Sequence, residues 1–385
     1  MGFDLQFRRY RLPFRAPVRT SHGVWPDREG VLIRLATEDG RVGFGEAAPI
    51  PWFGTETCDE IEHALRSLGP VVTDEQLDAI PPKLRCLRHA LGAARDRLRI
   101  ESSQSADTVE PRSAPGRDQV RTGSGQGADH VEPQSGSTRD TERIQSGPSA
   151  LAVAASLGAG RVALQQIDQK AEAGFRVFKW KVGVADARDE LVLLDELCAR
   201  LPEKAKLRLD ANGAWDRRTA EKWLERCAEY PVEFIEQPCF AEPNATPREK
   251  AKADDLLHGL ANDFPTPIAL DESVVSDGDV ERWLAEGWRG VFVLKPSLLA
   301  NPSGVLAQLR RANAEVVFSS ALETPVGANA ALAWAFRWSG APRALGFGVW
   351  PLFADARFDA PFSACFIRAE DVERINPEAV WNALS

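Results

Sequence analysis

Short apolar runs recur along the second half of the chain, and each is followed by a stretch whose apolar residues have helical spacing. Eight runs occur between residues 150 and 348: ALAVAAS, FRVFKWKVG, KLRLDANG, VEFIEQP, PIALDES, GVFVLKPS, EVVFSSAL and ALGFG. Repeated βα units predict a parallel sheet with right-handed crossovers, and eight of them predict a closed (β/α) barrel of the TIM type. An open doubly wound sheet is the alternative, but no glycine-rich phosphate loop follows the first run. We expect the barrel over residues 149–349.

Residues 1–100 show a mixed pattern that predicts an α+β capping domain. VLIRLATEDGRVGFGEAAPI contains two β-rich runs around Glu38–Gly40, which is typical of a hairpin. RTSHGVWPDREG and IPWFGTET are rich in Gly, Pro and polar residues, so we expect two long loops that can act as lids. Cys58–Leu68 and Lys83–Ile100 have apolar positions at helical spacing, and both predict helices. Residues 350–385 contain short strand-like segments, and we expect them to return to the capping domain.

Residues 101–148 differ in kind from both regions. Up to residue 147 they hold four large aliphatic residues and no aromatic residue, among many Ser, Gly, Gln and charged residues. ADTVEPRS at Ala106 recurs as ADHVEPQS at Ala128, an offset of 22 residues. Such a segment buries too little apolar surface to offset the entropy lost on ordering, so we expect a mostly disordered insertion with no part in the chemistry.

Composition narrows the class of protein further. The net charge of −9 over 385 residues, with no basic cluster, argues against a nucleic-acid surface. No apolar run reaches the length of a membrane span, and the first residues contain no signal-peptide core. The six cysteines are dispersed without a CxxC pair, which favours a reducing cytoplasm over a disulfide framework or a zinc site. We therefore expect a cytoplasmic protein with a small-molecule partner, and the oligomeric state stays open.

Two lysines stand on one face of the second run. Alternation along FRVFKWKVG places Lys179 and Lys181 together, opposite Phe178 and Trp180. Like charges at this spacing lower the pKa of at least one ammonium group, and a lysine that is neutral near physiological pH is a general base. The alternative is an edge strand with two solvated lysines.

Polar residues also stand at the carboxyl ends of the other runs, which is where barrel enzymes carry catalytic groups. In chain order these residues are Lys179 and Lys181, Asp210 and Asn212, Glu236, Asp271 and Glu272, Lys295, and Ser319 and Ser320. Three carboxylates converging from adjacent strands would repel each other without a cation, and oxygen ligands favour Mg²⁺. A carboxylate substrate held on that ion would have an acidic α-proton.

Each residue alone has a structural alternative. Asp210 is a candidate helix cap, and Glu236 and Asp271 are candidates for buried ion pairs. The two serines are candidates for a simple strand end. The order lysine, acid, acid, acid, lysine on five consecutive strands favours a catalytic site over these separate roles.

KWK, LDAN, IEQP, LDES and VLKPS, in this order, resemble the enolase superfamily, in its muconate-lactonising-type subgroup with a lysine pair. TSHG, REG, WFG and SSALE, at residues 20, 28, 52 and 319, resemble the o-succinylbenzoate synthase family within that subgroup. The resemblance implies a magnesium-dependent syn dehydration of 2-succinyl-6-hydroxy-2,4-cyclohexadiene-1-carboxylate in menaquinone or phylloquinone biosynthesis.

The resemblance also implies residue roles. Asp210, Glu236 and Asp271 would bind Mg²⁺. Lys181 would abstract the α-proton and return it to the departing hydroxyl, Lys179 would tune Lys181 and support the substrate carboxylate, and Lys295 would stabilise the developing charge. Three residues would support these groups from behind: Asn212, which would also contact the substrate, Arg208 and Glu272. Four residues would bind the succinyl tail of the substrate: Ser319, Ser320, His22 and Trp52.

Two other functions fit the same motifs. An N-acylamino-acid racemase or a dipeptide epimerase would use both lysines for proton transfer, although GFGVW at residues 346–350 contains no acidic specificity motif. A non-catalytic barrel that binds a carboxylate is the alternative from a different class, and it would have no use for a neutral lysine.

Overall fold

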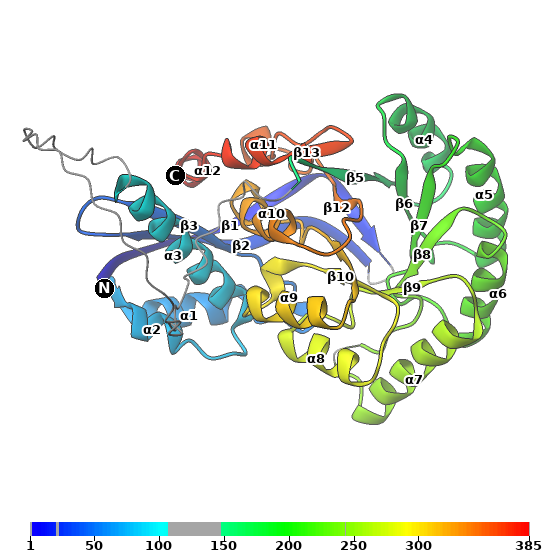
Figure 1. Ribbon diagram of the computed structural model, residues 1–385, viewed down its shortest axis with the longest axis horizontal. Helices are drawn as coiled ribbons and strands as arrows, with labels where there is room; N and C mark the ends of the chain where they lie inside the picture. The colour runs from blue at the N-terminus through cyan, green and yellow to red at the C-terminus, as the bar shows by residue number, and fades with distance from the viewer. Residues whose placement is uncertain (1, 21–22, 107–147, 243, 385) are drawn as a thin grey trace, which may run out of the picture.

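The computed structural model describes residues 2–20, 23–106, 148–242 and 244–384. It contains a four-stranded antiparallel sheet near the N-terminus and a nine-stranded, mostly parallel sheet that follows it. Figure 1 shows the N-terminal strands and helices on one side of the molecule and the parallel strands, ringed by helices, on the other. The barrel with a capping domain, expected from the sequence, is confirmed.

The capping sheet is built on one long hairpin. Its strand order is β3-β2-β1-β4. The strands are β1 (Gly2–Thr20), β2 (Gly23–Ala36), β3 (Val42–Ala47) and β4 (Val71–Thr73). The prediction of a long loop over residues 19–30 was wrong, because β1 and β2 stay paired as far as Thr20 and Gly23. The described part of RTSHGVWPDREG belongs to a two-stranded arm, and residues 21 and 22 lie outside the described residues.

Helices cover one face of the capping sheet. They are α1 (Cys58–Leu68), α2 (Asp74–Asp78) and α3 (Arg85–Ala106), with a 3₁₀ turn, η1, at Pro51–Phe53. A β-carbon at Gly43 or Gly45 would lie 1.9 Å from a carbonyl oxygen of α3, so these glycines let the helix backbone rest directly on β3. The helix continues six residues past residue 100, into the segment expected to be disordered. The rest of that segment, residues 107–147, lies outside the described residues.

All eight strands expected for the barrel are present. They are β5 (Ala150–Leu157), β6 (Val177–Lys181), β7 (Lys206–Asp210), β8 (Val232–Glu236), β9 (Ile268–Leu270), β10 (Val291–Leu294), β11 (Glu315–Phe318) and β12 (Leu345–Gly348). They pair in the order β11-β10-β9-β8-β7-β6-β5-β12. A parallel bridge between Ser319 and Gly346 joins the two end strands, so the curled sheet returns on itself.

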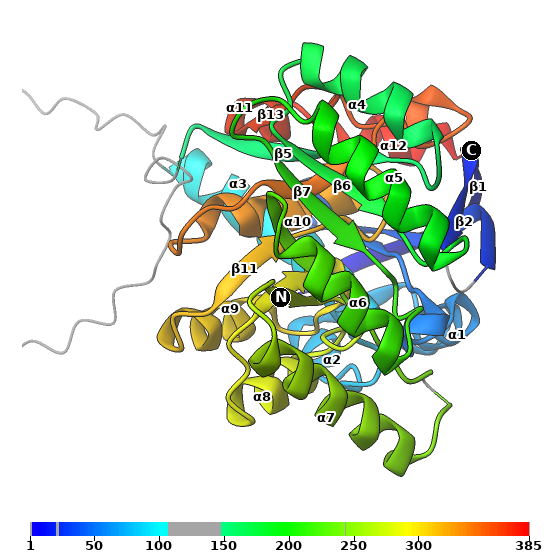
Figure 2. The same ribbon diagram turned by 90° about the vertical axis from the view of Figure 1, so that its right-hand side faces the viewer.

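Helices alternate with these strands and form the outer layer, which Figure 2 shows from the side of α4 to α7. They are α4 (Val162–Glu172), α5 (Ala187–Arg200), α6 (Arg217–Cys227), α7 (Pro247–Asp263), α8 (Asp277–Ala285), α9 (Pro302–Arg311) and α10 (Pro325–Arg337). Leu207, Ile235 and Phe292 face these helices in the main core. Side chains of the opposite face fill the barrel interior as a separate cluster: Phe234, Ala269, Val291, Val293 and Val317.

The C-terminal segment touches both parts of the molecule. Its elements are η4 (Ala356–Phe358), β13 (Phe366–Arg368), α11 (Ala369–Glu373) and α12 (Pro377–Ala383). β13 pairs antiparallel with β5 of the barrel. Phe353 forms a bridge with Phe14 of β1, and the Arg8 guanidinium lies 4.4 Å from the Trp381 ring centroid. The segment therefore joins the barrel to the capping domain.

A buried carboxylate from the cap also binds the barrel. Glu46 of β3 accepts hydrogen bonds from the backbone N–H groups of Thr324 (2.9 Å) and Gly327 (2.8 Å), at the start of α10. The Tyr10 hydroxyl donates to the same carboxylate at 2.5 Å. Since helix N-termini favour negative charge, Glu46 holds the cap above the carboxyl ends of the barrel strands.

In the part of the chain that the structure describes, no helix is long and apolar enough to span a membrane.

Candidate active site

The register of the parallel strands brings the predicted residues into one row. Lys181 pairs with Asp210, Asp210 with Glu236, and Glu236 with Ala269, two residues before Asp271. Side chains two residues apart on a strand share a face, so Asp271 rises beside this row on the same side. The carboxyl ends of three adjacent strands thus place three acids together at the mouth of the barrel, with Lys181 on the next strand beside them.

Lysine ammonium groups lie between these acids. Lys179 Nζ lies 2.6 Å from a carboxylate oxygen of Glu236 and 3.0 Å from Asp210 Oδ2. Lys181 Nζ lies 3.3 Å from the same oxygen of Asp210. Lys295, from the far side of the mouth, is paired with Asp271. The solvated-edge alternative for the lysine pair is therefore wrong, since both side chains turn into the site.

Burial and neighbouring charges shift the pKa values of these lysines and acids in different directions. Burial opposes the charge on Lys179, but Asp210 and Glu236 outweigh it and raise its pKa well above the usual range. Burial likewise opposes ionisation of Asp210, and Lys179 and Lys181 outweigh it and lower the pKa of Asp210. Burial, with repulsion from Asp210 and Asp271, raises the pKa of Glu236 to about 7 despite Lys179. Negative charge is therefore crowded around Glu236.

A second chain of contacts reaches Lys181 from the side. Its ammonium group donates to Asn212 Oδ1 at 2.9 Å, and Asn212 Nδ2 donates to Glu272 at 3.0 Å. Burial, with repulsion from Asp271 and Asp210, raises the pKa of Glu272 to about 8. Its Oε2 is a buried oxygen without a hydrogen-bond partner among the described residues. Asn212 thus holds Lys181 and is itself held by Glu272.

The donor set suits a hard divalent cation. Four carboxylates (Asp210, Glu236, Asp271, Glu272) meet three ammonium groups (Lys179, Lys181, Lys295), so the fully ionised cluster carries a net charge of 3 − 4 = −1. Crowded carboxylates offer only oxygen donors, and burial together with repulsion among them raises the pKa values of Glu236 and Glu272, so the set fits Mg²⁺. Among the described residues, no three carboxylate, imidazole or thiol groups are arranged so that they could hold a metal ion as they stand. Lysine nitrogens lie between the acids of this site. Binding a cation there requires the ammonium groups to withdraw.

The cap contributes an aromatic side chain over Lys295. Lys295 Nζ lies 5.1 Å from the ring centroid of Phe53, within cation–π range. Trp52, the predicted contact residue, packs edge-on against Phe53 (4.2 Å) and Trp25 (6.1 Å). Phe53 is therefore a site residue that sequence reasoning missed, although it lies in the same WFG motif. His22, the other predicted cap residue, lies outside the described residues.

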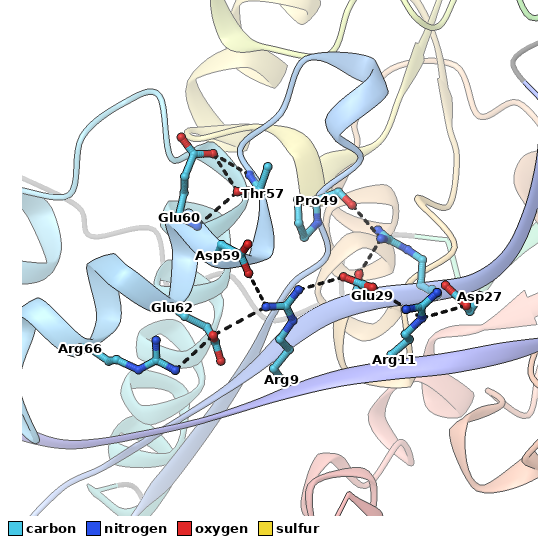
Figure 3. A network of polar contacts seen from close by, with 11 residues as sticks. Arg9, Arg11, Asp27, Glu29, Pro49, Thr57, Asp59, Glu60, Glu62 and Arg66 are labelled. Atoms are coloured by element: carbon cyan, nitrogen blue, oxygen red, sulfur yellow. Dashed lines mark hydrogen bonds and ion pairs between the residues drawn. The ribbon is translucent and has the colours of Figure 1, made fainter.

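A polar network fixes the loop that carries Phe53. The Arg28 guanidinium is buried and donates to the carbonyl oxygens of Glu29 (2.7 Å) and Pro49 (2.7 Å). Figure 3 shows Arg9 between Glu29 of β2 and the acidic side chains Asp59 and Glu62 of α1. These contacts tie the long hairpin to both ends of the loop, so the cap presents a defined surface to the barrel.

The two predicted serines are buried at the join between β11 and β12. Ser319 Oγ donates to the Gly346 carbonyl at 3.3 Å, and Ser320 N–H donates to the same oxygen at 3.2 Å. Ser320 Oγ donates to Glu323 at 3.0 Å. Glu323, which the sequence reasoning did not single out, therefore lies directly behind the serine pair.

Arg208 does not support the acids, and this expectation was wrong. Its guanidinium forms an ion pair at 2.7 Å with Glu233, near the amino end of the adjacent strand β8, and donates at 2.8 Å to the Ala344 carbonyl, just before β12. It also lies 4.9 Å from the Phe234 ring. A long side chain on the same strand face as the acids can point along the barrel axis toward the mouth or away from it, and the Arg208 side chain points away.

The chain matches two family models. Residues 163–364 match the enolase C-terminal domain-like family, and residues 4–84 match the MenC N-terminal domain. The o-succinylbenzoate synthase of Thermosynechococcus vestitus is 35% identical over 349 residues, covering 89% of this chain and 92% of that protein. The enzyme of the same name from Edwardsiella ictaluri is 29% identical, covering 83% and 82%.

Solved structures give the same result. The o-succinylbenzoate synthase of Thermosynechococcus elongatus BP-1, complexed with Mg in the active site, superposes with a TM-score of 0.68 at 34% identity and covers 91% of this chain and 94% of that one. The L-Ala-D/L-Glu epimerase of Bacillus subtilis reaches a TM-score of 0.73 at 18% identity, covering 96% of each chain, which shows the shared fold. By its matched domains and its relatives, this chain belongs to the enolase superfamily and, within it, to the o-succinylbenzoate synthase family.

Proposed function

We propose that this protein is an o-succinylbenzoate synthase of quinone biosynthesis, which removes water from 2-succinyl-6-hydroxy-2,4-cyclohexadiene-1-carboxylate. The observation that carries the proposal is the row of three acids at the barrel mouth, with Lys181 on one side and Lys295 on the other. Family membership and the relative with Mg in its active site support it.

Asp210, Glu236 and Asp271 are the residues that would hold Mg²⁺. When bound, the ion neutralises a substrate carboxylate and makes the adjacent C–H more acidic. Lys179, which lies between Asp210 and Glu236, would then turn to the substrate carboxylate as a fixed positive charge.

Lys181 Nζ is the proposed proton carrier. In its neutral form it takes the proton from the carbon α to the carboxylate, and the electron pair of that bond forms a ring double bond as the C–O bond to the hydroxyl breaks. The same Nζ returns its proton to the departing hydroxide, so water leaves, the ring becomes aromatic and the lysine is neutral again. Asn212 Oδ1, at 2.9 Å, orients Nζ for both transfers.

The remaining residues bind and enclose the substrate. Lys295 places a positive charge on the opposite face of the ring, and Phe53 above it excludes water. Ser319 and Ser320 form the wall proposed for the succinyl tail. All six cysteines are free thiols, which supports a cytoplasmic location.

Turnover of the purified protein tests the proposal directly. Loss of the cyclohexadiene chromophore is followed with Mg²⁺ and with EDTA, for wild type and for Lys181→Ala. We expect the variant and the EDTA sample to lose activity while circular dichroism stays unchanged. Lys204→Ala, an exposed lysine on the same chain, is the matched control and should keep full activity. Turnover by Lys181→Ala would remove Lys181 from the mechanism.

A racemase or epimerase activity is the alternative on the same site, because a lysine stands on each side of it. Such an enzyme exchanges the α-proton of both enantiomers of an N-acylamino acid or dipeptide with solvent. Incubation in D₂O with each enantiomer therefore distinguishes the reactions. Efficient exchange with both enantiomers, without turnover of the cyclohexadiene, would replace the synthase proposal.

A further inference from the structure

Gln237, the residue after Glu236, is completely buried beneath the acids and has no role in the proposed mechanism. Its backbone has a φ of +38°, a left-handed conformation that non-glycine residues adopt at a cost. A strained backbone at a buried position persists only where the surrounding contacts hold it.

The side-chain amide of Gln237 uses its full hydrogen-bonding capacity. Oε1 accepts from the backbone N–H groups of Asp271 (2.9 Å) and Ser273 (3.2 Å). Nε2 donates to Ser273 Oγ (2.8 Å) and to the Cys239 carbonyl (2.8 Å). A primary amide has two donor hydrogens and two acceptor sites, and all four are satisfied here.

The backbone of Gln237 extends the same connection. Its N–H donates to the Ala269 carbonyl at 2.8 Å, and its carbonyl accepts from Gly213 N–H at 2.7 Å. Gly213 belongs to the turn after β7, and Ala269 belongs to β9. Gln237 directly follows β8, so this one residue connects all three strands that carry the acids.

The position of Asp271 depends on this residue in particular. Asp271 follows β9, a strand of three residues, and its N–H is bound by a side chain of the neighbouring strand and not by a sheet partner. The Gln237 amide therefore fixes the Asp271 backbone relative to Glu236, which is adjacent to Gln237 in the chain.

We propose that Gln237 is a positioning residue, which sets the separation of the Glu236 and Asp271 carboxylates and thereby the affinity of the site for a divalent cation. The proposal rests on the assignment of these acids as metal ligands, but not on the identity of the substrate. Groups that orient metal ligands typically contribute about 10–100-fold to metal affinity.

Direct metal binding tests this role. Mn²⁺ is titrated into the full chain and followed by electron paramagnetic resonance, which reports binding without turnover. Gln237→Met keeps the length of the side chain and removes all four hydrogen bonds. We expect a dissociation constant at least tenfold higher than that of wild type, and kcat within about threefold of wild type once Mg²⁺ is saturating.

Thr266→Val is the matched control. Thr266 is buried two residues before β9 begins, and its hydroxyl donates to the Leu224 carbonyl at 3.0 Å. This variant loses a buried hydrogen bond at the start of the same βα unit, away from the acids, so we expect lower thermal stability and unchanged Mn²⁺ affinity. Unchanged affinity in Gln237→Met, or an equal loss in Thr266→Val, would overturn the proposal. Failure of wild type to bind Mn²⁺ would overturn the metal site itself.

Discussion

Glu323 is a buried carboxyl group whose ionisation the fold opposes. It accepts from Ser320 Oγ at 3.0 Å and from Ser297 Oγ at 3.4 Å, and it is fully buried. Burial, with repulsion from Glu46 of the cap, raises its pKa from the usual 4.5 to about 7, although Ser320 and Arg28 favour the charged form. Replacement by Gln keeps the shape of the side chain and removes the charge.

The sign and size of the effect follow from linkage. A folded-state pKa above the unfolded value means that the folded protein binds more protons between pH 4.5 and 7, so stability falls as pH rises through this interval. Each pKa unit corresponds to about 1.4 kcal/mol, and the full shift to about 3 kcal/mol. We expect Glu323→Gln to match wild type at pH 4.5 and to be more stable by up to about 3 kcal/mol at pH 8.5.

Urea unfolding at the two pH values measures this difference. Taking the difference between variant and wild type cancels the titrating groups that do not interact with Glu323. Glu225→Gln, on the exposed part of α6, is the control and should show no pH-dependent difference. A stability difference of the same size at pH 4.5 and pH 8.5 would show that folding does not raise the pKa of Glu323, and the reasoning would be refuted.

Two further predictions concern other parts of the barrel. Lys204 is exposed and has a φ of +63°, a backbone conformation that strains residues other than glycine. Lys204→Gly should therefore raise the free energy of unfolding by about 0.5–1 kcal/mol in urea titrations, and a loss of stability would show that the backbone is not strained there. Glu190 of α5 accepts hydrogen bonds from the backbone N–H groups of residues 183–185, just after Lys181. Glu190→Gln leaves one oxygen to accept from these three donors, so we expect a loss of about 1–3 kcal/mol in the free energy of unfolding and a lower kcat. Wild-type values of both quantities would show that this loop does not depend on Glu190.

Local pattern was sufficient for the barrel and for the row of charged residues at its mouth. A buried parallel strand is a short continuous apolar run, and all eight runs became strands. Because parallel strands end at one edge, residues that follow these runs must meet there, wherever they lie in the chain. Lys181, Asp210 and Glu236 are neighbours for this reason alone.

The capping domain was harder to predict. Residues 19–30 have the Gly-, Pro- and polar-rich composition of a loop, yet their described part forms a hairpin arm because β1 pairs with β2. Pairing is decided by the opposite strand and not by the residues of the arm itself.

Which way a side chain points, and what it bonds, was decided by tertiary structure. Arg208 shares a face with Asp210, yet it points to Glu233, because the acid that neutralises it lies at the other end of the next strand. The sequence alone does not distinguish Gln237 and Glu323 from other polar residues. Their importance arises from partners in other βα units: Asp271, after β9, for one and Ser297, after β10, for the other. Periodicity specifies a face and a level on a strand, whereas hydrogen bonds and charge pairs depend on distances that exist only after the strands have assembled.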